Sequence, residues 1–187
     1  GGKYIYVIQP VERKHIMTLT LIWAESKNGV IGNENKLPWH IKKELEHFKR
    51  TTMGHTVVFG YNTVKGFNGR LLDGRDTILF DPYENADIFE LGLENTPVGQ
   101  LENFTIANKE EILELAKTQE VFVAGGKATY DAFLLYADKI IRTIVEDQYQ
   151  GDTYAPHFTP RNFIKTEITL HTDNPNWKVE VYKRYDY

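Results

Sequence analysis

The chain has 187 residues, a length typical of one domain, and 41% of its residues are hydrophobic and 13% aromatic. Such a composition supplies a sizeable core and excludes disorder for most of the chain. The net charge of -4 lacks the basic excess of a nucleic-acid binder, and the apolar runs are far shorter than the roughly 20 residues of a membrane span. Because the chain contains no Cys, disulfides, thiolate metal sites and Cys nucleophiles are also excluded.

Residues 1–16 precede Met17, begin with Gly-Gly and lack the cleavage site and long apolar core of a signal peptide. We interpret them as an added leader or a cloning remnant. The folded domain is then expected to span residues 17–187.

Apolar runs rich in β-branched residues predict the strands, and amphipathic runs predict the helices. Strands are expected at residues 17–25, 55–60, 76–80, 103–107, 121–124 and 139–148, followed by two closing strands around a turn at 173–176. Helices are expected at residues 41–52, 108–119 and 127–137, the second with Asn108 as its cap. This alternation predicts a single-domain α/β fold with a mostly parallel central sheet, flanking helices and an antiparallel C-terminal hairpin.

Two segments carry no regular pattern. Residues 26–39 are rich in Gly and Asn, and Val30 and Ile31 stand between two glycines in a stretch with little apolar anchoring. We expect a mobile loop there, long enough to act as a lid that excludes water from a site. Residues 81–101 are acidic and rich in turn-forming residues, so no element is predicted for them.

The helix expected at 41–52 places a carboxylate close to its apolar face. Ile41, Leu45 and Phe48 form an i, i+4, i+7 stripe, and Glu44 lies within the arc of that stripe. A buried carboxylate is costly unless it is hydrogen-bonded, and such groups cluster at functional sites. Glu44 is therefore a candidate catalytic residue, although a glutamate at the edge of the stripe could equally reach solvent.

Glycines stand at two junctions between an expected strand and a following helix. Gly125 and Gly126 form one junction, and Gly60 lies in the other. Such glycines allow the backbone to approach a ligand closely, and two junctions in one open sheet suggest a dinucleotide lying across the strand ends. The spacing does not match a GxGxxG motif, so a simple chain turn is the alternative explanation.

Metal and serine-hydrolase chemistry find no support. The six His residues are scattered without ligand spacing, so no metal site is expected. Ser26 is the only Ser, and it lies in the Gly-rich loop, which excludes a Ser-His-Asp triad.

Five motifs occur in one order. They are GVIGNENKLPWHIKKELEHFKRTTMG at 29–54, VVFGYNT at 57–63, LLDGR at 71–75, VFVAGGKATY at 121–130 and GDTYAP at 151–156. In content and order the chain from Met17 to Tyr187 resembles the dihydrofolate reductase family. The resemblance implies a cytoplasmic, monomeric enzyme of one-carbon metabolism that reduces 7,8-dihydrofolate to tetrahydrofolate with a reduced nicotinamide cofactor, and that binds antifolates.

The same resemblance implies roles for individual residues. Glu44 takes the place of the active-site carboxylate, Trp39 orients a water beside it, Thr143 anchors it, and Arg75 grips the glutamate tail of folate. Substrate contacts are implied for Ile22, Ala24, Glu44, Leu45, Phe48, Arg75 and Thr143. Cofactor contacts are implied for Ala24, Ile31, Gly60, Tyr61, Asn62, Thr63, Asp81, Gly125, Gly126, Lys127, Ala128, Thr129 and Tyr130. A cis bond between Gly125 and Gly126 is also implied, and Arg75 could alternatively serve only to close its turn.

Three positions depart from the family pattern that favours the 2'-phosphate of NADPH. Tyr61 stands where the family usually has Arg, Asp81 follows the strand at 76–80, and Ala128 replaces a frequent Arg. A carboxylate at Asp81 would repel a phosphate, so NADH is a possible cofactor beside NADPH. The alternative is that Asp81 turns outward and Lys65 or Lys127 supplies the missing charge.

Two other functions stay open at this point. One is a pteridine or pyrimidine reductase of the riboflavin pathway with the same fold, against which Glu44 and Arg75 argue. The other is a catalytically silent nucleotide-binding homologue, suggested by Tyr61, Asp81 and Ala128.

Overall fold

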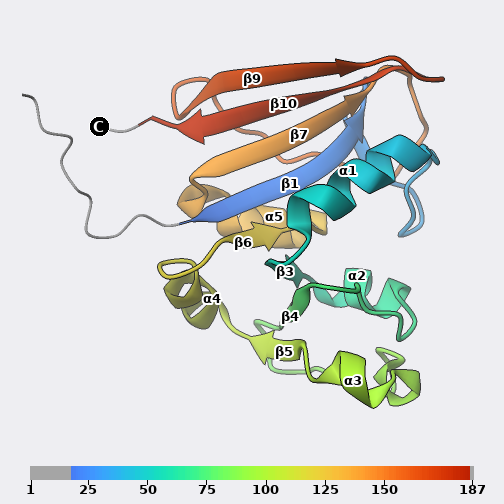
Figure 1. The fold of residues 1–187 in the computed structure, drawn as a ribbon, viewed down its shortest axis with the longest axis vertical. Helices are drawn as coiled ribbons and strands as arrows, with labels where there is room; N and C mark the ends of the chain where they lie inside the picture. Colours follow the sequence, from blue (N-terminus) through green and yellow to red (C-terminus); the bar gives the residue numbers. More distant parts are fainter. Residues whose placement is uncertain (1–17, 186–187) are drawn as a thin grey trace, which may run out of the picture.

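The computed structural model describes residues 18–185, so the leader expected at residues 1–16 lies outside the described part of the chain. One sheet of eight strands forms its centre, in the order β5-β4-β3-β6-β1-β7-β10-β9 (Figure 1). The strands are β1 (Leu19–Ser26), β3 (Thr56–Phe59), β4 (Asp76–Phe80), β5 (Phe104–Ala107), β6 (Val121–Val123), β7 (Lys139–Val145), β9 (Phe163–His171) and β10 (Trp177–Arg184).

The predicted fold class is confirmed by the strand directions. The strands from β5 to β7 pair in parallel, whereas β10 pairs antiparallel with both β7 and β9. The helices are α1 (Lys42–Thr52), α2 (Tyr61–Gly66), α3 (Val98–Leu101), α4 (Lys109–Leu115) and α5 (Lys127–Phe133), with short 3-10 turns η1 (Leu93–Asn95) and η2 (Leu134–Tyr136). No helix among residues 18–185 is long and apolar enough to cross a membrane.

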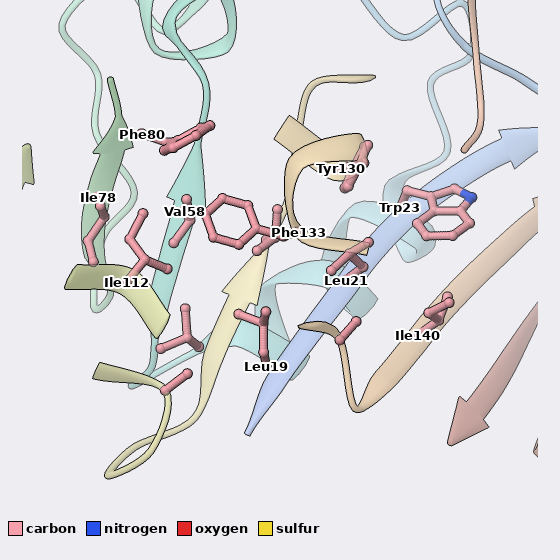
Figure 2. Packing of buried hydrophobic residues seen from close by; sticks show 14 of the residues in the cluster. Leu19, Leu21, Trp23, Val58, Ile78, Phe80, Ile112, Tyr130, Phe133 and Ile140 are labelled. Atoms are coloured by element: carbon pink, nitrogen blue, oxygen red, sulfur yellow. The ribbon is translucent and has the colours of Figure 1, made fainter. Parts of the chain in front are cut away.

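Two hydrophobic clusters fill the two faces of the sheet. Successive β1 side chains point to opposite faces, so Leu21 joins one cluster and Ile22 the other. In the first cluster, Phe133 of α5 packs edge-on against Phe80 at 5.0 Å (Figure 2). The second cluster includes Trp39, which comes just before α1. Central strands covered on both faces explain why their sequences read as nearly continuous apolar runs.

The expected elements are present, with shorter helices than predicted. Asn108 forms a capping box with Glu111 as predicted, but α4 ends at Leu115. The helix expected to continue to residue 137 changes at Phe133 into the 3-10 turn η2. Residues 81–101, for which no element was predicted, contain η1 and α3.

The Gly-rich loop is better anchored than its composition suggests. It contains β2 (Val30–Gly32), which pairs antiparallel with β8 (Thr153–Tyr154). Val30 is fully buried, so the expectation of little apolar anchoring is wrong. The contact partner lies about 120 residues further along the chain, which is why the local sequence does not reveal it.

Candidate functional site

Glu44 is buried in α1, with only 5% of its surface exposed. Its Oε2 atom has no hydrogen-bond partner. Burial raises the pKa of Glu44 to about 7, and the nearby indole N–H of Trp39 only partly offsets this. The expected buried carboxylate is therefore present, and near neutral pH it can hold or release a proton.

Two neighbours of Glu44 in the predicted site are also buried. Trp39 is 7% exposed, and its Nε1 has no partner with hydrogen-bond geometry. Thr143 is 2% exposed and pairs with Ala24 across β7 and β1. No hydrogen bond joins Thr143 to Glu44 in the described chain, so the anchoring role of Thr143 stays a prediction.

The predicted apolar stripe of α1 is only partly buried. Ile41 belongs to the core and Phe48 packs against it, but 41% of Leu45 is exposed. The apolar stripe is therefore covered at Ile41 and Phe48 but open at Leu45. An exposed leucine next to a buried carboxylate is available to pack against a flat ligand.

Arg75 lies buried at the start of β4, behind the end of α1. Its Nε donates to the carbonyl oxygen of Asp73 at 3.0 Å, and its Nη1 donates to Oγ1 of Thr52 at 3.2 Å. Among residues 18–185, no carboxylate lies within ion-pair distance of its guanidinium, and burial lowers its pKa from the ordinary value. The bond to Asp73 closes the turn, and the Asp73 carboxylate acts on the guanidinium only from beyond ion-pair distance, which leaves Arg75 suited to an anionic ligand.

The two glycine junctions lie side by side at the carboxyl ends of β3 and β6. The N–H of Gly60 donates to the carbonyl oxygen of Gly125 at 2.8 Å. A Cβ on Gly60 would collide with Oγ1 of Thr129, and Gly125 has a φ of +136° that L side chains rarely adopt. The bond between Gly125 and Gly126 is cis, as the resemblance implies. The junctions therefore form a backbone-lined surface that a ligand can approach closely.

Residues around these junctions differ in their accessibility. Asn62 and Ala128 are exposed, whereas Thr129 and Tyr130 are buried. The hydroxyl of Tyr130 donates to the carbonyl oxygen of Ile22 at 2.8 Å, so it already bonds within the core. Lys127 forms an ion pair with Asp131 at 2.9 Å.

The structure contradicts the alternative that Asp81 turns outward. Its carboxylate is buried and accepts the backbone N–H of Ala86 at 2.9 Å and of Asn85 at 3.3 Å. Asp81 thus closes the turn that follows β4 and does not point outward. Beside it lies a hollow of about 350 Å³, lined also by Glu84, Ile106, Asn108 and Glu111.

Glu90 is a residue that the sequence did not single out. Its Oε2 accepts a hydrogen bond from the hydroxyl of Tyr61 at 2.7 Å, and its Oε1 lies 3.4 Å from Nζ of Lys65. The hydrogen bond to Glu90 raises the pKa of Tyr61 to about 12. Only the acidic composition of residues 81–101 hinted at such a residue.

The Gly-rich loop is also tied to the segment before β8. The N–H of Glu34 donates to Oδ2 of Asp152 at 3.0 Å, and the N–H of Asp152 donates to the carbonyl oxygen of Gly32 at 3.1 Å. Ile31, which precedes these contacts, is half-buried. In the sequence, Asp152 stands out only as part of the GDTYAP motif at 151–156.

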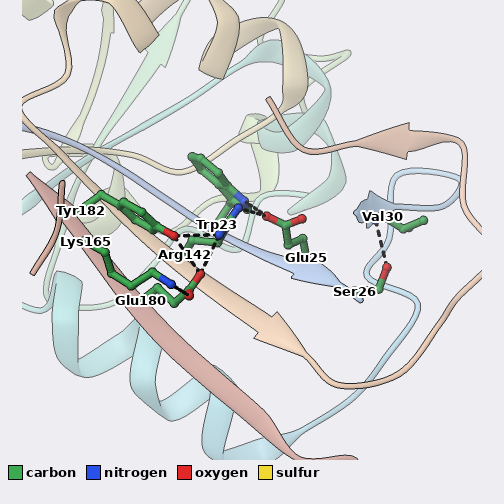
Figure 3. A network of polar contacts seen from close by, with 8 residues as sticks. All are labelled: Trp23, Glu25, Ser26, Val30, Arg142, Lys165, Glu180 and Tyr182. Carbon is green, nitrogen blue, oxygen red and sulfur yellow. Dashed lines mark hydrogen bonds and ion pairs between the residues drawn. The ribbon is translucent and has the colours of Figure 1, made fainter. Parts of the chain in front are cut away.

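A polar network fixes the strands that carry Ala24 and Thr143 (Figure 3). Arg142 of β7 donates to the Glu180 carboxylate of β10 at 2.7 Å, and Lys165 of β9 pairs with the same group at 2.6 Å. Burial alone would raise the pKa of Glu180, but these two cations hold it below its ordinary value. Arg142 also pairs with Glu25 of β1 at 3.6 Å, so four strands are cross-linked behind the site.

Comparison with known proteins gives one family. A family model described as "Dihydrofolate reductase" matches residues 18–185. The dihydrofolate reductase of Ureaplasma parvum serovar 3 is 36% identical over 137 residues, which are 73% of this chain and 80% of that protein. That of Lactococcus lactis is 32% identical over 137 residues, covering 72% of this chain and 76% of that protein.

A solved structure gives the same result. The dihydrofolate reductase from Enterococcus faecalis complexed with NADP(H) and RAB-propyl superposes with a TM-score of 0.76 at 29% identity. The match covers 90% of this chain and 97% of that one. From the family match, the sequence relatives and the shared fold together, we conclude that this chain belongs to the dihydrofolate reductase family.

Proposed function

We propose that the chain reduces 7,8-dihydrofolate to 5,6,7,8-tetrahydrofolate, with NADPH as the cofactor and Glu44 as the catalytic carboxylate. The observation that carries this proposal is the buried Glu44 carboxylate, whose Oε2 has no partner and whose pKa is raised to about 7. A group with this pKa can exchange a proton at neutral pH, where general acid and base catalysis is most effective.

The residues at the strand ends fit a dinucleotide. Gly60 lets the start of α2 pack against Thr129 beside the Gly125–Gly126 pair, and the Thr63 hydroxyl lies close to both glycines of that pair. Gly60, Thr63 and the glycine pair would hold the diphosphate portion, as expected for ligands at the carboxyl ends of parallel strands. When bound, the cofactor supplies the hydride.

Glu44 and Trp39 would then handle the proton. The protonated Glu44 would donate its proton toward the ring of the substrate, and the resulting carboxylate would take up a new proton from solvent through a water held at Nε1 of Trp39. Both polar atoms are buried and without partners, so a bound ring and a water would satisfy them. Ile22, Ala24, Leu45 and Phe48 supply the apolar contacts that orient the ring, and Arg75 would bind the glutamate carboxylates.

The test is an absorbance assay at 340 nm with dihydrofolate and each reduced cofactor, on the unaltered chain and on Glu44→Gln. We expect turnover with the unaltered chain and a loss of about 100-fold or more in the variant, which removes the proton relay but keeps the shape. Glu46→Gln, on the exposed side of α1, is the matched control and keeps its activity. Near-normal turnover in Glu44→Gln at pH 7 would refute the role of Glu44.

The other two functions are less well supported. The sequence relatives are dihydrofolate reductases, so a reductase of the riboflavin pathway is not favoured. A silent homologue is tested by the same assay, since it would bind the cofactor without oxidising it.

Three further properties belong to the proposal. Antifolates should compete with dihydrofolate, because they would use the same carboxylate. A monomeric state is tested by light scattering, and a cytoplasmic location by fractionation of the cells that produce the protein.

A further inference from the structure

Glu90 engages two of the side chains that could meet the adenosine half of a dinucleotide. Its carboxylate accepts the Tyr61 hydroxyl at 2.7 Å and pairs with Lys65 at 3.4 Å. Tyr61 and Lys65 both lie on α2, which follows β3, whereas Glu90 belongs to the segment that follows β4. The segment after β4 therefore folds back over the start of α2.

Hydrogen bonds and a buried neighbour hold the main chain around Glu90 in place, so the position of Glu90 is defined by the fold. Oδ1 of Asp87 accepts the N–H of Phe89 at 2.9 Å and of Glu90 at 3.3 Å. The next residue, Leu91, is fully buried and donates to the carbonyl oxygen of Asp87 at 3.0 Å. The Glu90 side chain itself is about half exposed, so its charge acts through partly screened surroundings.

The topology indicates which half of a dinucleotide passes this point. This step rests on the proposed function. With the reacting ring beside Glu44 and the diphosphate at Gly60 and Gly125, the other half continues along the sheet toward the ends of β4 and β5. We therefore expect its ribose near Tyr61 at the start of α2 and near the hollow beside Asp81, which follows β4.

The charges at this place do not suit a second phosphate. Carboxylates of Glu90 and Asp87 act on Tyr61, and Glu84 and Glu111 line the hollow beside Asp81. Lys65 is bound by Glu90, and Lys127 is bound by Asp131. A 2'-phosphate carries close to two negative charges. To bind Lys65 it would have to displace the Glu90 carboxylate, and it would then lie close to that carboxylate and be repelled by it.

We propose that Glu90 is a specificity-determining residue that weakens binding of NADPH relative to NADH, because it pairs with Lys65 and accepts the Tyr61 hydroxyl, so that neither side chain is available to a 2'-phosphate. An unphosphorylated ribose meets no such cost, because its hydroxyls can donate to carboxylates.

The test measures binding without turnover. The affinities of NADP⁺ and NAD⁺ for the full chain are determined by calorimetry at low ionic strength, for the unaltered protein, Glu90→Gln and Glu90→Ala. We expect both variants to raise the NADP⁺ to NAD⁺ affinity ratio about 5- to 10-fold, and the gain to shrink at high salt. Glu94→Gln is the matched control, an exposed glutamate in the same segment that should leave the ratio unchanged.

The same substitution made in a Lys65→Gln variant tests whether the freed Lys65 ammonium is the group that binds the 2'-phosphate. In Lys65→Gln, the change from Glu90 to Gln should give a much smaller gain, because no freed ammonium remains. An unchanged ratio in both Glu90 variants, or an equal gain in Glu94→Gln, overturns the proposal. Failure of the proposed function is separate, since it appears as missing dihydrofolate turnover while the nucleotide affinities are still measured. If the unaltered chain binds neither nucleotide, both proposals are overturned.

Discussion

The main chain of Gly151 lies directly against Val30, the buried residue of β2. A Cβ on Gly151 would collide with the Val30 side chain and lie 2.6 Å from the carbonyl oxygen of Gly32. Because Val30 and Gly32 anchor the Gly-rich loop, the position of this loop depends on a glycine some 120 residues away in the chain.

Gly151→Ala is therefore expected to displace β2 and loosen residues 26–37. Hydrogen exchange should show lower protection at Val30, whose N–H donates to Oγ of Ser26 at 2.9 Å (Figure 3). Gly99→Ala is the control, because a Cβ there meets nothing within 4 Å. If protection at Val30 is the same in both variants, the loop does not depend on the contact with Gly151.

The loop should also respond to the cofactor. Asn35 and Leu37 are exposed and lie beyond β2, and their N–H groups have no acceptor among residues 18–185, so they should exchange faster than Val30 in the free protein. Cofactor should slow their exchange if the loop closes over a ligand. Identical exchange with and without NADPH would argue against a lid.

Features that depend on local periodicity could be predicted from the sequence. The alternation of strands and helices predicts the parallel sheet. The spacing from Asn108 to Glu111 predicts the helix cap, and the helical period of residues 41–52 predicts that Glu44 lies among apolar residues. Each of these depends on neighbours within a few positions, where 2.0 and 3.6 residue periods apply.

Features that depend on distant contacts could not be predicted. Glu90 meets Tyr61 across 29 positions, and no local pattern distinguishes it from the other acids of residues 81–101. The exposure of Leu45 depends on what packs over α1, which an apolar stripe alone does not show. The Gly- and Asn-rich sequence around Val30 predicts a loosely held residue. That prediction was wrong because the segment near Gly151 that packs against Val30 is remote in the sequence.

Arg75→Leu should raise the KM for dihydrofolate and leave cofactor affinity unchanged. Loss of a charged pair of this kind costs about 2 to 4 kcal/mol of binding. Arg70→Leu, at an exposed position in the same region, is the control. A dihydropteridine without the glutamate tail should be reduced equally well by both proteins. If Arg75 serves only to close the turn through Asp73, both substrates will be affected alike.

Glu180→Gln should destabilise the fold without changing the KM values. Glu180 is 2% exposed, and its negative charge compensates the positive charges of Arg142 and Lys165. The neutral amide of the variant leaves these two cations without a counterion at this position. Because Lys165 is half exposed and Arg142 is partly exposed, solvent screens the pairs, and the expected cost is about 1 to 2 kcal/mol, measured as the free energy of unfolding in urea. Glu167→Gln, at an exposed position on β9, is the control. A stability equal to that of the control would mean that the network contributes little.

Glu44 should make the protein less stable as the pH rises. Its pKa is about 7 in the folded chain against an ordinary value of 4.5, so between these values the folded state holds a proton that the unfolded state has lost. Stability from this group is therefore complete below pH 4.5, decreases as the pH rises to about 7 and is constant above that. The difference amounts to about 3 kcal/mol.

Removing the charge isolates this contribution. Glu44→Gln should match the unaltered chain at low pH and exceed its free energy of unfolding by up to about 3 kcal/mol at pH 8. His47 acts in the opposite direction, because burial lowers its pKa to about 4 and its contribution increases as the pH rises toward 6.5. Since His47 is present in both proteins, the difference between them cancels its effect. Urea unfolding at pH 5 and pH 8 measures the difference, with Glu46→Gln as the control. A difference that does not grow with pH would mean that Glu44 is charged at both pH values. In that case the pKa of Glu44 would not be raised in the folded protein, and the physical reason for assigning it the role of proton donor would be lost.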